Sequence, residues 1–587
     1  MFAKVRLLHG YQELLTYSIP DSWGNENLIG SIVKVPIQKK QEFAVILETF
    51  EELDINTKFK IREIDHLEDI PSDKSYFEFL ERLASYYCLD SIIFLKRIRK
   101  FLDNKELEAE EIIGDIKYIP EALNSSTQLT KDQTYIVNEI TKFIYNPEYK
   151  ANLIHGVTGS GKTEIYKKLI LETIKNKKSV ILMLPEVSLA TQFEKLLKKQ
   201  LEGLVEIFGF HSATSVSHKK ELWSKLLHKT PILIVGVHLP VLLPISNLGL
   251  IIIDEEHDVG YQEKKHPKIN SKEAAILRAS YNKIPIVLGS ATPSISSIYN
   301  IKNKNWNLFE LKKRFSGQFP KVEIVNLKED KKNKNFWISQ KLEDAIGSQL
   351  EKKEQTIVFI NRRGYSFFVQ CKCCSYVFSC SSCSVSLTLH GYEKLICHYC
   401  GFNKILPQNC DSCKKDSKNF LKKGLGTQQV TDILQALYPE AKIARADVDS
   451  TVDRKKWAET IKNFEEGHID ILVGTQTVTK GYHFPKVTLV GVIWADVNLN
   501  FPVYNCAEIT LQQLIQVAGR AGRQSENSKV IIQTLINHKI YDFINEADYM
   551  KFYDFEIEKR KMVEYPPIIR LAEIELKNTD EQKIESD

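Results

Sequence analysis

The chain has 587 residues, of which 43% are hydrophobic and 26% charged, with 80 Lys and Arg against 75 Asp and Glu and a formal net charge of +5. This composition is that of a folded protein of about four domains and excludes a disordered or collagen-like chain. No apolar run approaches the roughly 18 residues of a membrane span, and the N-terminus lacks the apolar segment of a signal peptide. We therefore expect a cytoplasmic protein without membrane contact. The small net charge alone does not indicate nucleic-acid binding.

The first hundred residues predict a small β-rich module followed by helices. Runs at 32–35 and 43–47 alternate apolar and polar residues and are separated by turn residues, which is typical of short strands. Apolar residues recur at helical spacing between residues 75 and 102. Residues 103–128 are acidic and then rich in Ser, Thr and Asn, so we interpret them as a linker.

After residue 128, apolar runs of strand length alternate with segments of helical pattern, which is typical of a parallel α/β sheet. A first series of runs lies at 151–153, 180–184, 232–235, 250–253 and 286–288, and a second at 356–360, 444–446, 470–473, 487–493 and 530–534. Two such sheets in tandem fit two nucleotide-binding lobes. A Cys-rich segment interrupts the second series as an insertion.

Residues 156–163, GVTGSGKT, match the phosphate-binding motif G-x-x-x-x-G-K-[ST] between a predicted strand and a predicted helix. The glycines permit close backbone approach, so amide groups and the helix N-terminus can surround anionic oxygens. Lys162 would then reach the β- and γ-phosphates, and the Thr163 hydroxyl would bind Mg²⁺. The predicted nucleotide-binding residues are Gly156, Val157, Thr158, Gly159, Ser160, Gly161, Lys162 and Thr163.

An apolar run at 250–253 ends in the acids Asp254 and Glu255. Carboxylates at the C-terminal end of a strand lie where α/β sheets bind ligands. We predict that Asp254 holds Mg²⁺ and that Glu255 orients the attacking water for phosphoryl transfer. Such a run is commonplace alone, but together with the phosphate motif it predicts hydrolysis of a nucleoside triphosphate.

Further runs follow predicted strands: GSATP at 289–293, GTQ at 474–476, KG at 480–481, and QVAGRAGR at 516–523. The last run places Arg520 and Arg523 three residues apart, and an arginine from a second lobe can stabilise charge that develops on a γ-phosphate. The alternative for any single run is a solvated surface. Their joint occurrence in this order favours a motor enzyme.

Nine of the 11 cysteines fall between Cys371 and Cys413. Eight of them form four C-x-x-C pairs, and two such turns complete one tetrahedral zinc site, so we predict two structural Zn²⁺ ions. Disulfides are the alternative, which a reducing cytosol disfavours. The spacing does not decide which pairs share an ion. The predicted ligands are Cys371, Cys374, Cys380, Cys383, Cys397, Cys400, Cys410 and Cys413.

The phosphate motif, DEEH at 254–257, GSATP, GTQ…KG and QVAGRAGR in this order resemble a superfamily two helicase. LPE at 184–186, NRRGY at 361–365, GLGT at 424–427 and GYHFP at 481–485 further resemble PriA, the family of bacterial primosomal replication-restart DNA helicases. The resemblance extends from the N-terminus to about Pro567. It implies an α/β fold with two tandem RecA-like parallel-sheet lobes, a two-zinc Cys-rich insertion and an N-terminal β-rich DNA-binding module.

The resemblance also implies roles for single residues. Gln133 would contact adenine, and Lys162 and Thr163 the phosphates of ATP. Asp254 and Glu255 would serve the metal and the water, while Gly474, Gln516, Arg520 and Arg523 would couple ATP to lobe closure. The cysteines would be nested, with the first C-x-x-C pair sharing an ion with the fourth and the second with the third.

We accordingly expect the following domains. Residues 1–102 form a DNA-binding module for a 3′ end, and 103–128 are a linker too short for the family's winged helix. Lobe 1, which binds ATP, spans 129–310, and lobe 2 comprises 311–370 and 421–545 around a zinc insertion at 371–420. Residues 546–587 begin a C-terminal domain that we expect to be incomplete.

The function we predict is an ATP-dependent 3′→5′ DNA helicase that recognises stalled or forked DNA and initiates primosome assembly. Partners implied by the resemblance are forked and single-stranded DNA, single-stranded DNA-binding protein and helicase-loading primosome proteins, with the chain itself a monomer. Thr16 stands where the family has an acid in its 3′-end module. The alternatives are a fork-binding scaffold with a dispensable ATPase, and a related helicase that remodels branched recombination DNA.

Overall fold

The computed structural model divides the chain into two compact units. The first comprises Met1–Gly156, Gly161–Ser290 and Trp306–Leu311, and the second Val157–Ser160, Ala291–Asn305 and Lys312–Asp587. The structure describes residues 1–8, 13–23, 28–52, 61–68, 70, 75–103, 128–315, 319–330, 335–360, 369–381, 386–390, 393–397, 401–421, 425–446, 454–475, 484, 486–501, 503–521 and 528–572. Most of the expected linker at 103–128 lies outside these ranges.

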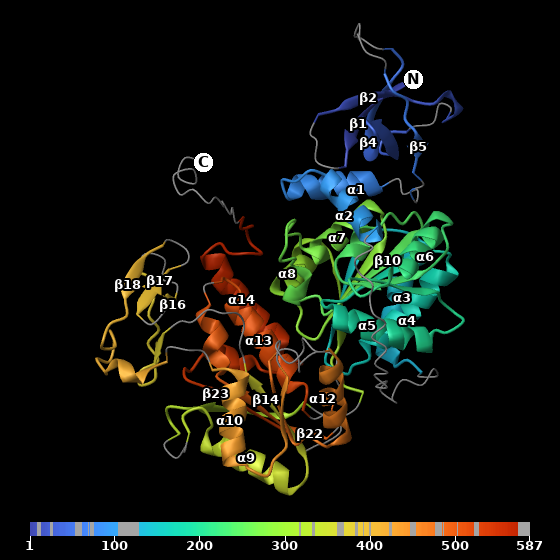
Figure 1. The fold of residues 1–587 in the computed structure, drawn as a ribbon. Coiled ribbons are helices and arrows are strands. Elements are labelled where there is room, and N and C mark those ends of the chain that lie inside the picture. Colours follow the sequence, from blue (N-terminus) through green and yellow to red (C-terminus); the bar gives the residue numbers. More distant parts are fainter. Residues whose placement is uncertain are drawn as a thin grey trace. The chain divides into compact units, whose positions relative to one another are not determined.

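An antiparallel sheet opens the first unit (Figure 1), with strand order β2-β1-β4-β3-β5. Its strands are β1 (Phe2–Leu7), β2 (Leu15–Ser18), β3 (Ile32–Ile37), β4 (Lys40–Phe50) and β5 (His66–Leu67). Buried and partly exposed residues alternate along β1, because one face of the sheet covers a core while the other meets water. Val5, Val33 and Ile46 lie in that core. The predicted β-rich N-terminal module is confirmed.

Two helices follow this sheet, α1 (Tyr76–Tyr86) and α2 (Ile92–Asp103). A buried arginine joins α1 to α7 (Ser271–Tyr281). Arg278 donates hydrogen bonds to the carbonyls of Val241 and Leu243, at 2.8 and 2.6 Å. Its guanidinium carbon lies 5.3 and 5.4 Å from the ring centres of Tyr76 and Phe79. The charge is thus buried against carbonyl dipoles and aromatic faces that compensate for lost hydration.

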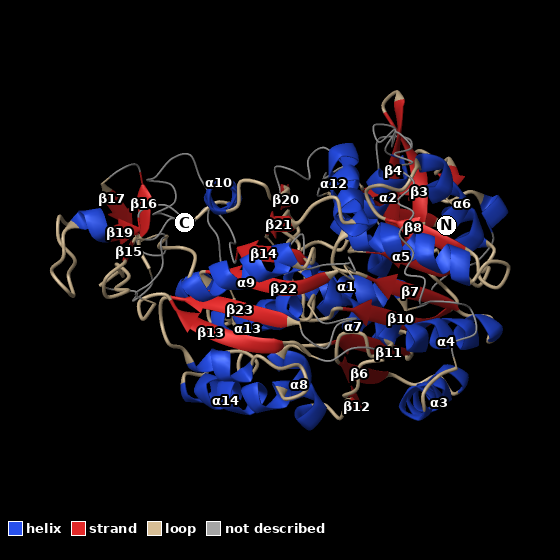
Figure 2. Cartoon of the chain, turned by 90° about the horizontal axis from the view of Figure 1, so that it is seen from below, coloured by secondary structure: helices blue, strands red, loops and turns tan. Residues whose placement is uncertain are grey.

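A seven-stranded parallel sheet forms the centre of the first unit, in the order β12-β6-β11-β10-β7-β9-β8. The strands are β6 (Lys150–Gly156), β7 (Ser179–Met183), β8 (Ile207–Phe210), β9 (Leu233–Gly236), β10 (Leu248–Asp254), β11 (Pro285–Ser290) and β12 (Asn307–Leu311). The helices are α3 (Lys131–Tyr145), α4 (Lys162–Lys175), α5 (Val187–Gln200), α6 (Val216–Leu227) and α7, with short 3₁₀ turns η2 (Leu239–Leu242) and η3 (Val259–Tyr261). Figure 2 shows the strands between helices, so both faces are covered and central strands such as β10 are buried throughout.

A second parallel sheet, of six strands, forms the centre of the second unit in the order β13-β23-β22-β14-β21-β20. The strands are β13 (Lys321–Asn326), β14 (Gln355–Ile360), β20 (Ile443–Ala446), β21 (Ile471–Gly474), β22 (Val487–Ile493) and β23 (Lys529–Thr534). The helices are α8 (Ile295–Asn303), α9 (Gln340–Glu351), α10 (Thr427–Leu437), α12 (Arg454–Glu466), α13 (Cys506–Ala518) and α14 (Tyr549–Met562), with turns η6 (Ala495–Asn500) and η7 (Lys539–Phe543). Leu342, Val358 and Val473 pack in its core.

The Cys-rich segment is inserted between β14 and α10 and forms two small antiparallel sheets, β15-β19 and β16-β17-β18. Their strands are β15 (Gln370–Cys371), β16 (Thr388–His390), β17 (Lys394–Ile396), β18 (Asn403–Ile405) and β19 (Phe420–Leu421), with the turn η4 (Ser417–Asn419). Cysteines lie in its small core beside Phe378 and Leu387, so we expect a bound metal to contribute to its folding.

The predicted fold class is therefore confirmed: two parallel-sheet lobes, a Cys-rich insertion in the second, and an N-terminal β module. Within the described ranges, no helix combines the length and the apolar character needed to cross a membrane.

Replacing Arg278 by Leu should destabilise the first unit by about 2 kcal/mol or more, because the two carbonyls lose their donor. We expect the first thermal transition to fall by about 5 °C, measured by circular dichroism. Glu273→Gln, an exposed change on the same helix, is the control and should leave it unchanged. An unaltered transition for Arg278→Leu would contradict this account of how α1 is held.

Candidate functional site

The phosphate motif forms the connection between β6, which ends at Gly156, and α4, which begins at Lys162. Gly161 has φ +83°, a left-handed conformation that favours glycine. The Lys162 ammonium donates to the Gly156 carbonyl at 2.7 Å, so its charge is held at the start of the loop. The unpaired amides at the start of α4 make an anion-binding site. The strand–loop–helix context predicted for this motif is observed.

Gln133, the predicted adenine contact, is buried near the start of α3. Its amide oxygen accepts a hydrogen bond from the Thr130 backbone N–H at 2.9 Å, while the Thr130 hydroxyl accepts from the Gln133 N–H at 3.2 Å. This reciprocal cap fixes the side chain. A Cβ atom added to Gly161 would lie 2.3 Å from the Gln133 amide nitrogen. The structure thus brings Gln133 to the phosphate motif, and its contact with adenine stays a prediction.

Asp254 is the last residue of β10 and its side chain is buried. The Tyr166 hydroxyl, from α4, donates to Asp254 Oδ1 at 2.9 Å. Burial and the neighbouring Glu255 carboxylate raise the pKa of Asp254 to about 6, although Lys162 and the Tyr166 hydrogen bond act in the opposite direction. A divalent cation would remove the repulsion between these acids. The donor set therefore fits Mg²⁺, which Asp254 and Thr163 would hold.

Glu255 follows with φ +48°, a conformation that is unusual for a residue with a side chain. Its carboxylate lies 3.7 Å from His257 Nδ1, and that nitrogen lies 2.7 Å from the Ser290 hydroxyl. The next acid, Glu256, pairs with Lys272 at 2.9 Å. The three acids therefore have different surroundings, and Glu255 is the most exposed of them.

Two tyrosines that support this edge, Tyr166 and Tyr261, were not predicted from the sequence. A Cβ atom on Gly289 would lie 1.7 Å from the Tyr166 hydroxyl, so only glycine allows the tyrosine to reach Asp254. Tyr261 is buried, and its hydroxyl, which has one hydrogen to donate, lies 2.6 Å from the Asp254 carbonyl and 3.0 Å from the Met183 carbonyl. The one available signal for Tyr166 was its helical spacing from Lys162, which places both on one face of α4.

The predicted coupling residues lie in the second unit. Gly474 ends β21, Gln516 lies on α13, and Arg520 follows the end of that helix. Arg523 lies outside the described residues, as do Gln476 and Lys480 of the GTQ…KG run. The roles of these residues stay predictions.

Helix α13 holds the segment that follows β11. The Gln512 side-chain amide donates to the Thr292 carbonyl at 3.2 Å, and Glu508 accepts from the Ile295 N–H at 2.8 Å. Glu508 also pairs with Arg560 of α14 at 2.8 Å. Helix α13, which also carries the first residues of the QVAGRAGR run, is thereby bonded to Thr292 of the GSATP run and to Ile295 just after it.

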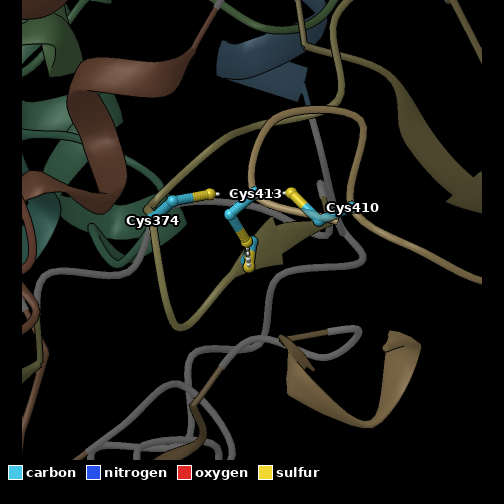
Figure 3. A group of neighbouring side chains, drawn as sticks. Cys374, Cys410 and Cys413 are labelled. Atoms are coloured by element: carbon cyan, nitrogen blue, oxygen red, sulfur yellow. Dashed lines mark hydrogen bonds between the residues drawn. The ribbon is translucent and has the colours of Figure 1, made fainter. Parts of the chain in front are cut away.

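Four of the predicted zinc ligands converge: the ligand atoms of Cys371, Cys374, Cys410 and Cys413 all lie within 4.8 Å of one another. The Cys371–Cys413 and Cys374–Cys410 sulfur distances are 3.7 and 3.5 Å. Zn–S bonds of about 2.3 Å in a tetrahedron place sulfurs about 3.8 Å apart, so the group fits Zn²⁺. Figure 3 shows sulfurs of three of these residues turned towards one another. This is the outer site of the nested arrangement.

Burial raises the pKa of Cys374, but hydrogen bonds from the Tyr376 backbone and neighbouring thiols outweigh it and lower the pKa to about 7. The pKa values of its partners Cys371 and Cys410 are instead raised by burial, so a bound cation would be needed to hold the whole group as thiolates. Cys380 and Cys397, half of the predicted inner site, are buried in the same module. Cys383 and Cys400 lie outside the described residues, so the inner site stays a prediction.

Replacing Cys374 by Ala should lower the zinc content from two ions per chain to one, because three thiolates do not close the tetrahedral site. Cys373→Ala is a matched control, since Cys373 lies in the same turn but is exposed and is not in the group of four. Zinc per chain is measured by inductively coupled plasma mass spectrometry. Equal zinc in both variants would exclude Cys374 as a ligand.

Four family models match the chain: 3′DNA-binding domain (3′BD) at 4–99, DEAD/DEAH box helicase at 130–301, PriA DNA helicase Cys-rich region (CRR) domain at 380–404, and Helicase conserved C-terminal domain at 417–525. Among solved structures, the chain is similar to RecG bound to a three-way DNA junction, with 16% identity, a TM-score of 0.45 and coverage of 74% of this chain and 47% of that one.

Two curated relatives are both replication restart protein PriA. The Bacillus subtilis protein is 39% identical over 448 residues, which cover 76% of this chain and 55% of the relative. The Rickettsia conorii protein is 34% identical over 580 residues, which cover 97% of this chain and 86% of the relative. Both helicase models match as well. The chain therefore belongs to the PriA family of replication restart proteins and is an ATP-dependent DNA helicase with a zinc-binding Cys-rich region.

Proposed function

We propose that this helicase moves 3′→5′ on DNA, recognises stalled or forked DNA and initiates primosome assembly for replication restart. The observation that carries the ATPase part is the buried Asp254 at the end of a central strand, followed by the more exposed Glu255, with Tyr166 of the phosphate-loop helix bonded to Asp254. A helicase needs this chemistry to drive movement. The fork-specific part rests on the family and on its 3′DNA-binding module.

In this proposal the phosphate loop and α4 bind the nucleotide, and Lys162 balances the charge of its phosphates. Mg²⁺, held by Thr163 and Asp254, supplies charge neutralisation when bound. Glu255 orients the attacking water, because its carboxylate is the more exposed of the acidic pair and its backbone is fixed by the turn after β10. Gln516, Arg520 and Arg523 couple the nucleotide to closure of the lobes.

The N-terminal module would bind the 3′ end of a nascent strand. Tyr17 of β2 is buried and donates to the Pro36 carbonyl of β3 at 3.1 Å, which ties the strand that carries Thr16 to β3. Thr16 stands beside it on the same strand and is partly exposed. Single-stranded DNA-binding protein and helicase-loading primosome proteins are the partners we propose, for a monomer acting in the cytoplasm.

Lys162→Ala should abolish unwinding, by about 100-fold or more, and leave fork binding within about twofold of the original chain. The lysine acts on phosphates and not on DNA. Lys168→Ala, an exposed lysine on the same helix, is the matched control. Unwinding is measured by strand separation and binding by fluorescence anisotropy. If the Lys162→Ala variant still unwound DNA, the proposal that ATP bound at this loop drives unwinding would be wrong.

Forks that carry a 3′-OH leading strand at the junction should be unwound several-fold faster than forks with a gap there, because the N-terminal module engages that end. Initial rates on the two matched forks, with Glu255→Gln as the hydrolysis-deficient control, measure this preference. Equal rates, with faster unwinding of a four-way junction, would favour the branched-DNA alternative.

A further inference from the structure

A carboxylate of the protein itself is hydrogen-bonded to the phosphate loop. In the second unit, Glu546, from the segment before α14, accepts hydrogen bonds from the Thr158 backbone N–H at 3.0 Å and from the Thr158 hydroxyl at 2.5 Å. The next loop residue is also held, since the Gly159 carbonyl accepts from the Phe315 N–H at 2.9 Å. Two segments remote in sequence thus meet at residues of the motif that exists to bind anions.

A buried arginine accompanies this carboxylate. Arg314 Nη2 lies 3.1 Å from Glu546 Oε2, with the two side chains only 6% and 2% exposed. Its other terminal nitrogen, Nη1, is buried and has no hydrogen-bond partner among the residues that the structure describes. The guanidinium carbon also lies 5.2 Å from the centre of the Phe319 ring. An aromatic face does not replace a hydrogen-bond acceptor, so a buried N–H at Nη1 is costly and can still donate to an anion.

The surroundings identify the class of that ligand. Arginine is the side chain best suited to phosphate, because its planar fork donates two parallel hydrogen bonds. A Cβ atom on Gly519 would lie 3.1 Å from Glu546 Oε1, so the carboxylate also abuts the QVAGRAGR run. The carboxylate that pairs with Arg314 therefore contacts one motif that handles nucleotide phosphates and lies next to another.

We propose that Arg314 is a further nucleotide-binding residue. The Glu546 carboxylate occupies the position of a nucleotide phosphate on Arg314 and Thr158 until that phosphate displaces it. The exchange swaps one anion for another and forms no covalent bond. It rests on ATP binding at this loop. Because the carboxylate competes with the phosphate and repels it, the two side chains must affect affinity in opposite directions.

The test measures the Kd of a fluorescent, non-hydrolysable ATP analogue for the full chain with Mg²⁺ and without DNA. Arg314→Ala should weaken binding about tenfold or more, the value of one charge-assisted hydrogen bond. Glu546→Gln keeps the size of the side chain and removes its charge, so it should tighten binding about threefold or more. Lys313→Ala, an exposed neighbouring cation, is the control and should stay within about twofold.

Thermal unfolding is recorded for every variant. If Arg314→Ala unfolds, Arg314→Lys replaces it and should still weaken binding, since lysine lacks the planar fork. Opposite signs at the two positions support the proposal. Weaker or unchanged binding in Glu546→Gln at a normal Tm would overturn it, because the carboxylate would then be only a structural tether for the loop. Failure of the unaltered chain to bind the analogue would instead refute the proposed ATPase.

Discussion

The chemistry of the first lobe depends on one constraint, negative charge that is held out of water at the end of a buried strand. Asp254 ends β10, whose seven residues are all buried, and Glu255 follows directly. Burial and, after it, repulsion from the Glu255 carboxylate raise the pKa of Asp254 to about 6, so this edge favours a cation. Lys162 and the Tyr166 hydroxyl partly offset the charge. A cation and a phosphate together would complete the balance.

The partner of Asp254 can reach it only where the neighbouring backbone at this edge of the sheet carries no side chain. Tyr166 can reach Asp254 because Gly289, on the neighbouring strand β11, has no side chain. Parallel strands place their carboxyl ends side by side, so acids, glycines and hydroxyls from distant parts of the sequence meet there. The Cys-rich segment is stabilised in a different way from the sheet. Its small core is held by sulfur atoms that a metal would join, since apolar burial alone is insufficient.

Compensation of charge also explains the contacts of Glu546 in the second unit. A phosphate loop without its ligand presents unpaired amides, and Glu546 satisfies one of them. The carboxylate is in turn balanced by Arg314, and Gly519, which has no side chain, leaves room for it. Because an uncompensated buried charge is costly, charged residues near a ligand site take partners that the ligand must replace.

The sequence by itself determined the features whose chemistry is encoded by local spacing. These are the phosphate loop, the acids after an apolar run, the C-x-x-C pairs, the fold class and the family. It left the pairing of the cysteines open, and the structure brings together Cys371, Cys374, Cys410 and Cys413. Only the tertiary structure decided the partners of these motifs, such as Tyr166 for Asp254 and Glu546 for Thr158. Those contacts span 88 and 388 residues. No local sequence pattern predicts them, because they depend on how distant segments pack against one another when the chain folds.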